Sequence, residues 1–353
     1  MIATDAALTE WLPRLKASPW VALDTEADSL HSYPEKLCLV QISLPGEDRL
    51  VDPLAGMDLR PLWQALSGRE ILLHAGDYDL RLLHRGPGFV PTRVFDTMLA
   101  ARLLGLKEFG LNPLVQKFLG VVLEKGPQRA DWSRRPLTER MMTYARNDAR
   151  YIEPLASRLR VELEAKGRLE WHAQMCEQLI HEACQPPSNN HDDAWRIKQA
   201  DRLSRQGMAI LRELWHWRDR EAVASNRPPF FILTHDALFG LAVALANGEP
   251  PDAFIPRRYS PRRRERLKQA IEAARAVPES DWPIPRKVRG RRLTTAQKHQ
   301  LERLRAWRDR AAARLDLDPT LIASRSMLVT LAAGSPGADV GLLPWQEALL
   351  QPA

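Results

Sequence analysis

Asp24 and Glu26 are two acidic residues at the end of an apolar run, and their types and spacing suit the binding of a metal ion. They follow Val21-Ala22-Leu23, a run typical of a buried strand. Side chains alternate across a strand, so the two carboxylates share one face. Neighbouring carboxylates at a buried strand end repel each other and lose hydration, and a divalent cation between them relieves both costs. The alternative is a strand that runs into an acidic turn, because Asp-x-Glu is a short pattern.

Three further residues can extend this pair into a site. Asp79 follows an apolar run and lies at the start of a predicted helix, where the helix dipole alone also favours a carboxylate. Tyr144 and Asp148 are four apart on another predicted helix, so they project from one face, one turn apart. An ordinary, half-exposed helix face is the alternative for this pair.

Together, the four carboxylates suit two hard divalent cations, Mg²⁺ or Mn²⁺, which prefer oxygen ligands. Two such ions about 3.5–4 Å apart support phosphoryl transfer, because one lowers the pKa of a water and the other stabilises the leaving oxygen. Tyr144, one turn from Asp148, can orient that water by a hydrogen bond. It need not act as the base.

The segments that must position these residues alternate between strand and helix patterns, which predicts a mixed α/β domain. The first three strands, with Pro45-Gly46 at a turn, predict an antiparallel meander. A long helix is expected to open after Leu137, with Thr138 as its cap. The predicted strands cover 20–26, 37–43, 49–52, 71–74 and 94–95, and the predicted helices cover 4–15, 59–67, 97–104 and 111–119, with another beginning near residue 77.

These motifs resemble the DEDD 3′–5′ exonucleases of the tyrosine subgroup, and most of all ribonuclease D. The first motif is Asp24-Thr25-Glu26 with 37–42 behind it, and the second is His74-Ala75-Gly76-Asp77-Tyr78-Asp79-Leu80. The third is Tyr144-Ala145-Arg146-Asn147-Asp148. Connecting segments also match, and the resemblance covers about residues 1–165. The matching connecting segments are Phe95-Asp96-Thr97, Gly110-Leu111, Asp131-Trp132-Ser133 and Arg135-Pro136-Leu137.

The resemblance implies a ribonuclease H-like exonuclease fold, with a mixed sheet flanked by helices, and a role for each matched residue. Asp24, Glu26 and Asp148 would hold the ion on the nucleophile side. Asp24 and Asp79 would serve the second ion, Asp79 through water. Ala27 departs from the family, which usually has an aromatic residue after the glutamate, so recognition of the terminal nucleotide is in doubt.

The C-terminal half contains an internal repeat. Trp217-Arg218-Asp219-Arg220 recurs as Trp307-Arg308-Asp309-Arg310, 90 residues later, with apolar positions matching in the same register. Each copy resembles the HRDC domain at the end of ribonuclease D, an all-α bundle. The bundles are not expected to be catalytic. The ordinary explanation of the Trp-Arg-Asp pattern is helix packing, with the tryptophan in the core and Asp-Arg as a surface pair, and we expect this explanation to hold for the tryptophans.

A helix is expected over residues 169–184, and Pro186-Pro187-Ser188-Asn189-Asn190 is expected to be a linker. His172, Cys176, His181 and Cys184 point around this helix rather than to one side, which argues against a zinc site. We therefore expect an exonuclease domain at 1–190, an HRDC domain at 200–285 and a second HRDC-like helical domain at 292–353.

Positive charge is concentrated between the two repeats. Residues 257–293 hold thirteen basic and four acidic residues, although the whole chain of 353 residues has a net charge of only +7. A charged run is usually a solvated face, but beside a nuclease it favours contact with phosphates. The candidate nucleic-acid-binding residues are Arg257, Arg258, Arg262, Arg263 and Arg264.

Three cysteines and no long apolar stretch lead us to expect a soluble, cytoplasmic protein with no signal peptide and no membrane partner. No organic cofactor is expected. The predicted function is 3′–5′ exoribonuclease activity on RNA with a free 3′ end, tRNA precursors being the family expectation. The alternatives are the same chemistry on DNA and a catalytically silent RNA-binding protein.

Overall fold

The computed structural model describes residues 1–185, 193–285, 293–334 and 340–351. Its contacts divide the chain into two units. The first comprises 1–27, 37–185 and 290–353, and the second comprises 28–36 and 186–289. The predicted linker at 186–190 and the basic residues at 286–292 lie outside the described residues. None of the described helices combines the length and apolar character that a membrane span requires.

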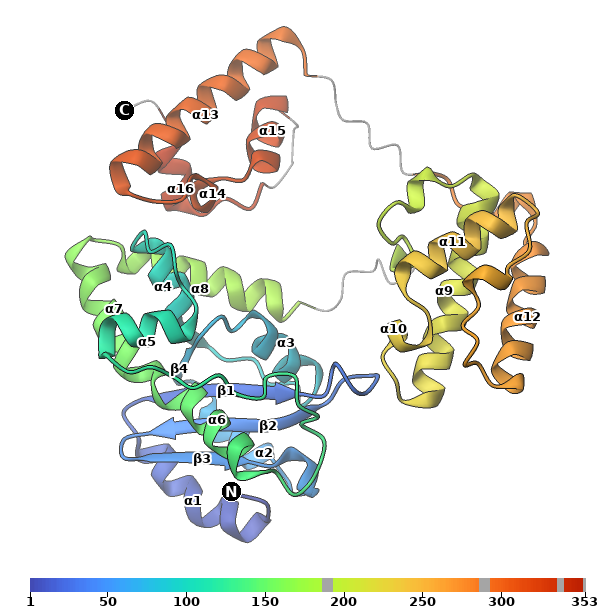
Figure 1. Ribbon diagram of the computed structural model, residues 1–353. Helices are drawn as coiled ribbons and strands as arrows, with labels where there is room; N and C mark the ends of the chain where they lie inside the picture. Colours follow the sequence, from blue (N-terminus) through green and yellow to red (C-terminus); the bar gives the residue numbers. More distant parts are fainter. Residues whose placement is uncertain (186–192, 286–292, 335–339, 352–353) are drawn as a thin grey trace. The chain divides into compact units, whose positions relative to one another are not determined.

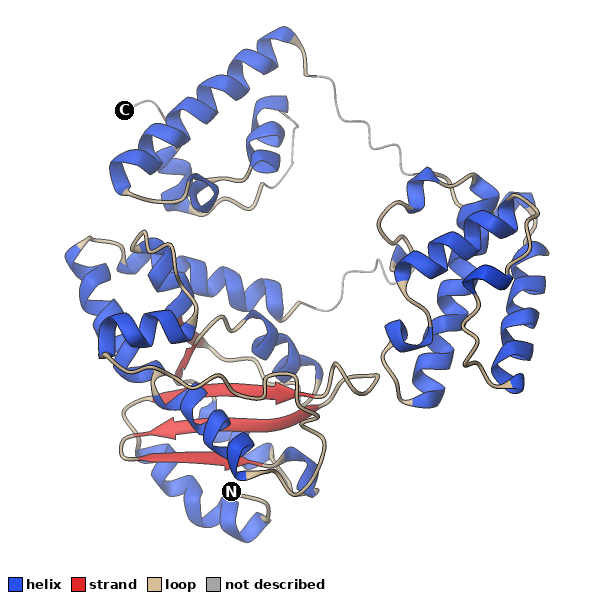
Figure 2. Ribbon diagram, in the orientation of Figure 1, coloured by secondary structure: helices blue, strands red, loops and turns tan. Residues whose placement is uncertain are grey.

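A five-stranded mixed sheet forms the centre of the first unit, in the order β3-β2-β1-β4-β5 (Figure 2). The strands are β1 (Val21–Ala27), β2 (Leu37–Leu44), β3 (Glu47–Val51), β4 (Glu70–Leu73) and β5 (Arg93–Asp96). The first three pair antiparallel, which confirms the predicted meander, and β4 and β5 extend the sheet parallel to β1. Strand β4 is followed by a helix that begins at Asp77, and β5 is followed by a helix that begins at Thr97.

Helices cover both faces of the sheet because its strands are apolar on both sides (Figure 1). One core joins one face of the sheet to α1 (Asp5–Ala17), α2 (Arg60–Leu66), α3 (Asp77–Arg85) and α8 (Leu169–Ala183). The other face is covered by helices that include the one bearing Asp148. These helices are α4 (Thr97–Leu103), α5 (Leu111–Leu119), α6 (Glu139–Arg150) and α7 (Ile152–Ala165), and a short 3₁₀ helix, η1, spans Pro53–Ala55.

The long helix predicted to open after Leu137 begins where expected, but the structure divides it into two helices. Thr138 caps α6, and its side chain accepts a hydrogen bond from the Met141 amide at 3.2 Å. The helix stops at Arg150, and after Tyr151 the chain continues as α7. The capping pattern marked the start. Pro154, in the first turn of α7, accompanies the break, because a proline fits the first turn of a helix but not its interior; the sequence analysis did not use this signal.

The 90-residue repeat is reproduced by the helices. In the second unit α9 spans Arg205–Ser225, and in the C-terminal module α13 spans Thr295–Leu315, the same length in the same register. Both end in a left-handed cap residue, Asn226 and Asp316. The remaining helices are α10 (Pro229–Ile232), α11 (His235–Ala246), α12 (Pro261–Arg275), α14 (Pro319–Ile322), α15 (Arg325–Ala333) and α16 (Pro344–Leu349), with 3₁₀ helices η3 (Ala200–Arg202), η4 (Asp252–Phe254) and η5 (Glu279–Asp281).

The arginine of the repeated motif makes the same hydrogen bond in both copies. Arg218 donates to the Leu233 carbonyl at 3.3 Å, and Arg308 donates to the Ala323 carbonyl at 3.1 Å, each fifteen residues on. Arg218 is only 3% exposed. Arg218 is therefore a buried donor and not half of a surface Asp-Arg pair, whereas Arg308 also pairs with Asp309. In each copy the bend after a four-residue helix leaves a carbonyl that needs a donor.

The C-terminal module packs with the nuclease part inside the first unit. Arg168 donates to the Leu103 and Leu315 carbonyls, at 2.5 and 2.7 Å, and so links segments from both parts. Trp171 and Trp345 stack with ring centroids 4.8 Å apart. These contacts join helices that are far apart in the sequence into one apolar core.

Candidate active site

Strand β1 and helix α6 bring three of the four predicted carboxylates together. Ligand oxygens of Asp24, Glu26 and Asp148 all lie within 4.8 Å of one another. Asp24 and Glu26 project from the same face of β1, as alternation along the strand predicts, and α6 packs over that face. Each of the three side chains is partly buried.

Asp79, the fourth carboxylate, lies in the first turn of α3 and is 7% exposed. It accepts a hydrogen bond from the Thr25 hydroxyl, the residue between Asp24 and Glu26. Asp79 is not part of the three-residue cluster, but its charge raises the pKa of both Asp24 and Glu26. The four carboxylates therefore form one electrostatic unit, with Asp79 on its margin.

The charged forms of these carboxylates are unfavourable without a counter-ion. Burial is the main cause, followed for Asp24 and Glu26 by repulsion from the other carboxylates. The pKa of Asp24 lies well above its ordinary range, and that of Glu26 rises to about 9. Burial raises the pKa of Asp79 and of Asp148 to about 6. A cluster of hard oxygen donors with this excess of negative charge fits a divalent cation such as Mg²⁺ or Mn²⁺.

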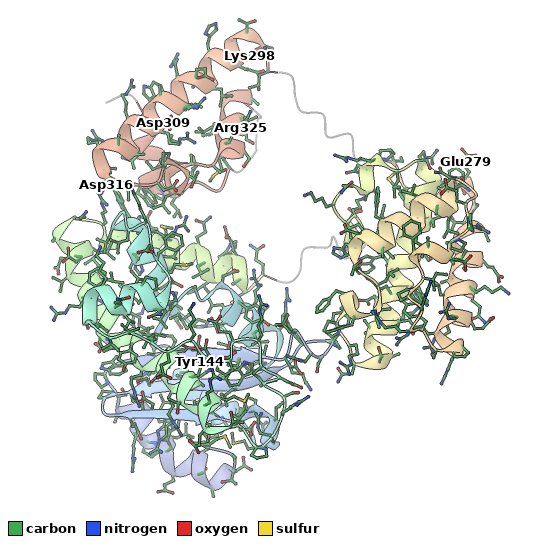
Figure 3. All side chains as sticks on the ribbon, viewed as in Figure 1. Tyr144, Glu279, Lys298, Asp309, Asp316 and Arg325 are labelled. Carbon is green, nitrogen blue, oxygen red and sulfur yellow. The ribbon has the colours of Figure 1, made fainter. Side chains whose placement is uncertain are left out.

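Tyr144 lies on α6 one turn before Asp148 and donates a hydrogen bond to its carboxylate (Figure 3). Burial, followed by the charge of Asp148, raises the pKa of the Tyr144 hydroxyl far above neutrality. Gln128 also hydrogen-bonds this hydroxyl. Tyr144 is therefore a hydrogen-bond donor at the site and not a base at neutral pH.

Gly126 makes room for the ring of Tyr144, a role that the sequence analysis missed. A Cβ atom at Gly126 would lie 1.5 Å from Cδ2 of Tyr144. Nine residues further along the chain, the Arg135 guanidinium donates to both carboxylate oxygens of Asp52 at 2.6 Å. A glycine in a predicted loop carries no signal that distinguishes close approach from a turn, so the sequence could not reveal this contact.

Asp96 stabilises the turn between β4 and α3, and this turn positions Asp79. One carboxylate oxygen of this fully buried residue accepts from the Gly76 amide at 2.8 Å, and the other caps α4. Ala75 adopts a left-handed backbone conformation in this turn, with φ of 56°. The His172 ring bonds the Asp96 carbonyl at 2.9 Å, so this histidine supports the turn rather than a metal.

Gln41 is a second residue that the sequence analysis did not assign. It pairs with Asp24 across β1 and β2, so the two side chains lie on the same face. Gln41 is fully buried, and neither polar atom of its amide has a partner among the residues that the structure describes. An amide left in this state beside a carboxylate fits a site that is completed by an ion or by ordered water.

The five arginines predicted to bind nucleic acid lie on or before α12 and have different local partners. Arg263 pairs with the buried Glu221, with Nε and Oε2 3.0 Å apart. Arg258 and Arg264 donate to backbone carbonyls of the same module. Arg257 and Arg262 are exposed. Contact with nucleic acid stays a prediction for all five.

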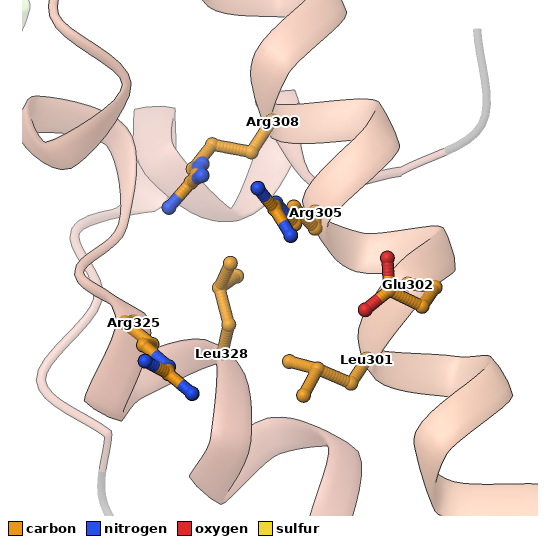
Figure 4. Close-up of a pocket in the computed structure, with 6 residues that line it drawn as sticks. All are labelled: Leu301, Glu302, Arg305, Arg308, Arg325 and Leu328. Atoms are coloured by element: carbon orange, nitrogen blue, oxygen red, sulfur yellow. The ribbon is translucent and has the colours of Figure 1, made fainter.

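The C-terminal module contains an arginine-rich pocket of about 310 Å³ (Figure 4). Arg305, Arg308 and Arg325 line it together with Leu301, Glu302 and Leu328. In the repeat register Trp215 and His235 stand where Arg305 and Arg325 stand in this copy. Asp309 pairs with Arg308 and Arg305, so part of this positive charge is compensated.

Two parts of the chain match models of known families. Residues 1–164 match the family model described as 3′-5′ exonuclease, and residues 207–247 match the HRDC domain model. The crystal structure of Escherichia coli RNase D, described as an exoribonuclease involved in structured RNA processing, is 27% identical. Its TM-score is 0.75, and the match covers 99% of this chain and 95% of that chain.

Curated relatives of similar sequence are also ribonucleases D. A ribonuclease D of Psychromonas ingrahamii is 33% identical over 244 residues, which is 69% of this chain and 65% of that protein, less than two thirds of its length. A ribonuclease D of Pseudomonas paraeruginosa is 31% identical over 339 residues, 94% of this chain and 88% of that protein. Nearly the whole chain thus aligns with a curated relative, and its nuclease motifs gather on the expected fold: it belongs to the ribonuclease D family.

Proposed function

We propose that this protein is a metal-dependent 3′–5′ exoribonuclease that hydrolyses phosphodiester bonds from the 3′ end of RNA. The observation that carries the proposal is the cluster of Asp24, Glu26 and Asp148 within 4.8 Å, on the fold of this family. Asp79 and Tyr144 complete the proposed set. All five are site residues of the proposal, four of them as metal ligands.

Two divalent cations, Mg²⁺ or Mn²⁺, are the proposed cofactors. The donor set supports this, because four carboxylates balance two divalent ions and carboxylate oxygens suit both metals. Asp24, Glu26 and Asp148 would hold one ion, and Asp24 and Asp79 would serve the other. When bound, such ions supply Lewis acidity to the attacking water and to the leaving oxygen.

The protein's own residues would bind the ions and orient the attacking water. The raised pKa values of the carboxylates mean that ion binding must displace protons from the site, so affinity for the metal rises with pH. Tyr144 stays protonated and offers its hydroxyl as a hydrogen-bond donor. Gly126 leaves the space that the tyrosine ring occupies. Tyr144 is thus proposed to orient the water and not to deprotonate it.

RNA with a free 3′ end is the proposed substrate, with tRNA precursors as a specific example. The support is the family, since the relatives named above are ribonucleases. Discrimination from DNA requires contact with the 2′-hydroxyl, which the carboxylates do not provide. The three cysteines are free thiols, which supports a reducing compartment, the cytoplasm, as the proposed location.

The test is degradation of a 5′-labelled RNA with a single-stranded 3′ overhang beside the matching DNA. Each is incubated with the wild type and with Asp24→Asn in Mg²⁺, Mn²⁺ or EDTA. The proposal predicts a ladder that shortens from the 3′ end of the RNA and disappears with EDTA or the substitution. Equal or faster degradation of the DNA would show that the enzyme is a 3′–5′ exodeoxyribonuclease instead. Salt-sensitive RNA binding without any product would show a silent binding protein.

A further inference from the structure

An exposed aromatic pair lies at the edge of the first helical module, in the second unit. Phe230 and Phe231 in α10 are 47% and 44% exposed. Their ring centroids are 4.7 Å apart, with planes tilted by 35°. The next two residues, Ile232 and Leu233, are at most 2% exposed and supply the core contacts of this segment. The module therefore does not use these two rings to fill its core.

Two arginines adjoin the rings. The Arg227 guanidinium lies 5.9 Å from the centroid of the Phe231 ring. Arg258 donates from Nη2 to the Phe231 carbonyl at 3.0 Å, and both arginine residues are exposed. Aromatic faces beside guanidinium groups match the two parts of a single-stranded nucleotide, its unstacked base and its phosphate.

The repeat supplies a comparison for this edge of the module. Leu317 and Leu321 occupy the positions of Arg227 and Phe231 in the second copy. They are 7% and 4% exposed and belong to the core that joins the C-terminal module to the nuclease part. The same edge is thus a packing surface in the second copy. In the first copy its apolar residues are exchanged for exposed aromatic and cationic ones.

We propose that Phe230 and Phe231, with Arg227 and Arg258, form a stacking platform for unpaired bases of the RNA substrate. The proposal rests on the function proposed above and adds a binding site outside the carboxylate cluster. Single-stranded RNA is the favoured occupant, because its bases have free faces and its phosphates complement the arginines. In a duplex the bases already stack on one another, so duplex RNA gains little from the two rings.

The experiment measures binding of a fluorescent, unstructured 12-nucleotide RNA by anisotropy, with full-length protein in EDTA so that metal-dependent hydrolysis is absent. The double substitution Phe230→Ala/Phe231→Ala is expected to raise Kd by about tenfold or more. The slope of log K against log salt should stay unchanged, because no charge is removed. Arg227→Ala should reduce the steepness of that slope by about 0.7, the contribution of one phosphate on a single strand.

Two controls separate stacking from loss of structure. Phe230→Tyr/Phe231→Tyr retains both ring faces and is expected to bind like the wild type. Val223→Ala removes another exposed apolar side chain of the same module, 50% exposed, and should leave Kd unchanged. Thermal unfolding of each variant checks that the module is intact.

An unchanged Kd for the double alanine variant would overturn the proposal, as would equal weakening in the double tyrosine variant. A wild type that does not bind the RNA would overturn it as well, and a platform for a protein partner would then be the remaining reading. Hydrolysis by the wild type, measured separately with metal, tests the carboxylate site. A 3′ ladder together with an unchanged Kd would refute the platform alone, whereas absence of the ladder would refute the proposed function.

Discussion

At the scale of single residues, the proposed chemistry depends on carboxylates that are difficult to ionise without metal. Burial raises the pKa of the Asp24, Glu26 and Asp148 side chains. Repulsion from the other carboxylates, Asp79 among them, raises it further for Asp24 and Glu26. The protein keeps this destabilising arrangement in the folded state. Such a cost is expected where a site is built for a ligand and not for stability.

Asp148→Asn tests that cost directly. A carboxyl with a pKa raised on folding binds more protons when folded, so its favourable contribution is complete below about pH 4 and is lost as pH rises through about 6. In EDTA the variant should therefore be more stable than the wild type at pH 8, with the difference vanishing near pH 4. Urea unfolding at both pH values measures this. A variant that is less stable at pH 8 would contradict the account.

Tyr144→Phe removes only the hydroxyl that hydrogen-bonds Asp148. We expect kcat to fall roughly 10- to 100-fold through loss of orientation, with little change in KM. Mn²⁺ binding, measured by calorimetry, should persist because the carboxylates remain. Loss of metal binding in this variant would instead assign the tyrosine a structural role.

At the scale of elements, the strand and helix ends matter most, because they aim the side chains. Alternation along β1 and the four-residue spacing on α6 were enough to predict which faces Asp24, Glu26 and Asp148 occupy. Gly126, Gln41 and Asp96 could not be assigned from the sequence. Their roles arise from contacts between segments that only the folded chain brings together.

Gly126→Ala should act through Tyr144. The added methyl group would overlap the tyrosine ring, so the loop or the ring must move. We expect kcat to fall by about as much as in Tyr144→Phe, and the two effects should not add in the double variant. Gly110→Ala is the matched control, since its Cβ would meet only Pro113 Cδ at 3.7 Å. Full activity in Gly126→Ala, or strict additivity, would contradict this coupling.

At the scale of the whole molecule, the repeat was evident from the 90-residue offset, but the different use of its two copies was not. The second copy packs on the nuclease part through Leu317, Leu321 and the stacked Trp171–Trp345 pair. This packing depends on residues more than 150 positions apart, and periodicity within a segment carries no information about it. The bonds of Arg218 and Arg308 to backbone carbonyls fifteen residues on were also missed, because the sequence does not show where the chain bends back.

Trp345→Ala should loosen the C-terminal module from the first unit. Trp345 is 4% exposed, and removing a buried tryptophan side chain costs about 3–5 kcal/mol. We expect a lower Tm and earlier proteolysis of residues 293–351. Ile284→Ala is the control, because that side chain is 73% exposed. An unchanged Tm in Trp345→Ala would show that the packing contributes little to stability.

The central claim is that the carboxylate cluster removes nucleotides from a free 3′ end. The most direct measurement compares one RNA, linear with a 5′ label or closed into a circle, during incubation with Mg²⁺ or Mn²⁺. We predict that the wild type shortens the linear RNA from its 3′ end and leaves the circle intact. Asp24→Asn should leave both intact. Cleavage of the circle, or an undiminished ladder from Asp24→Asn, would contradict the account.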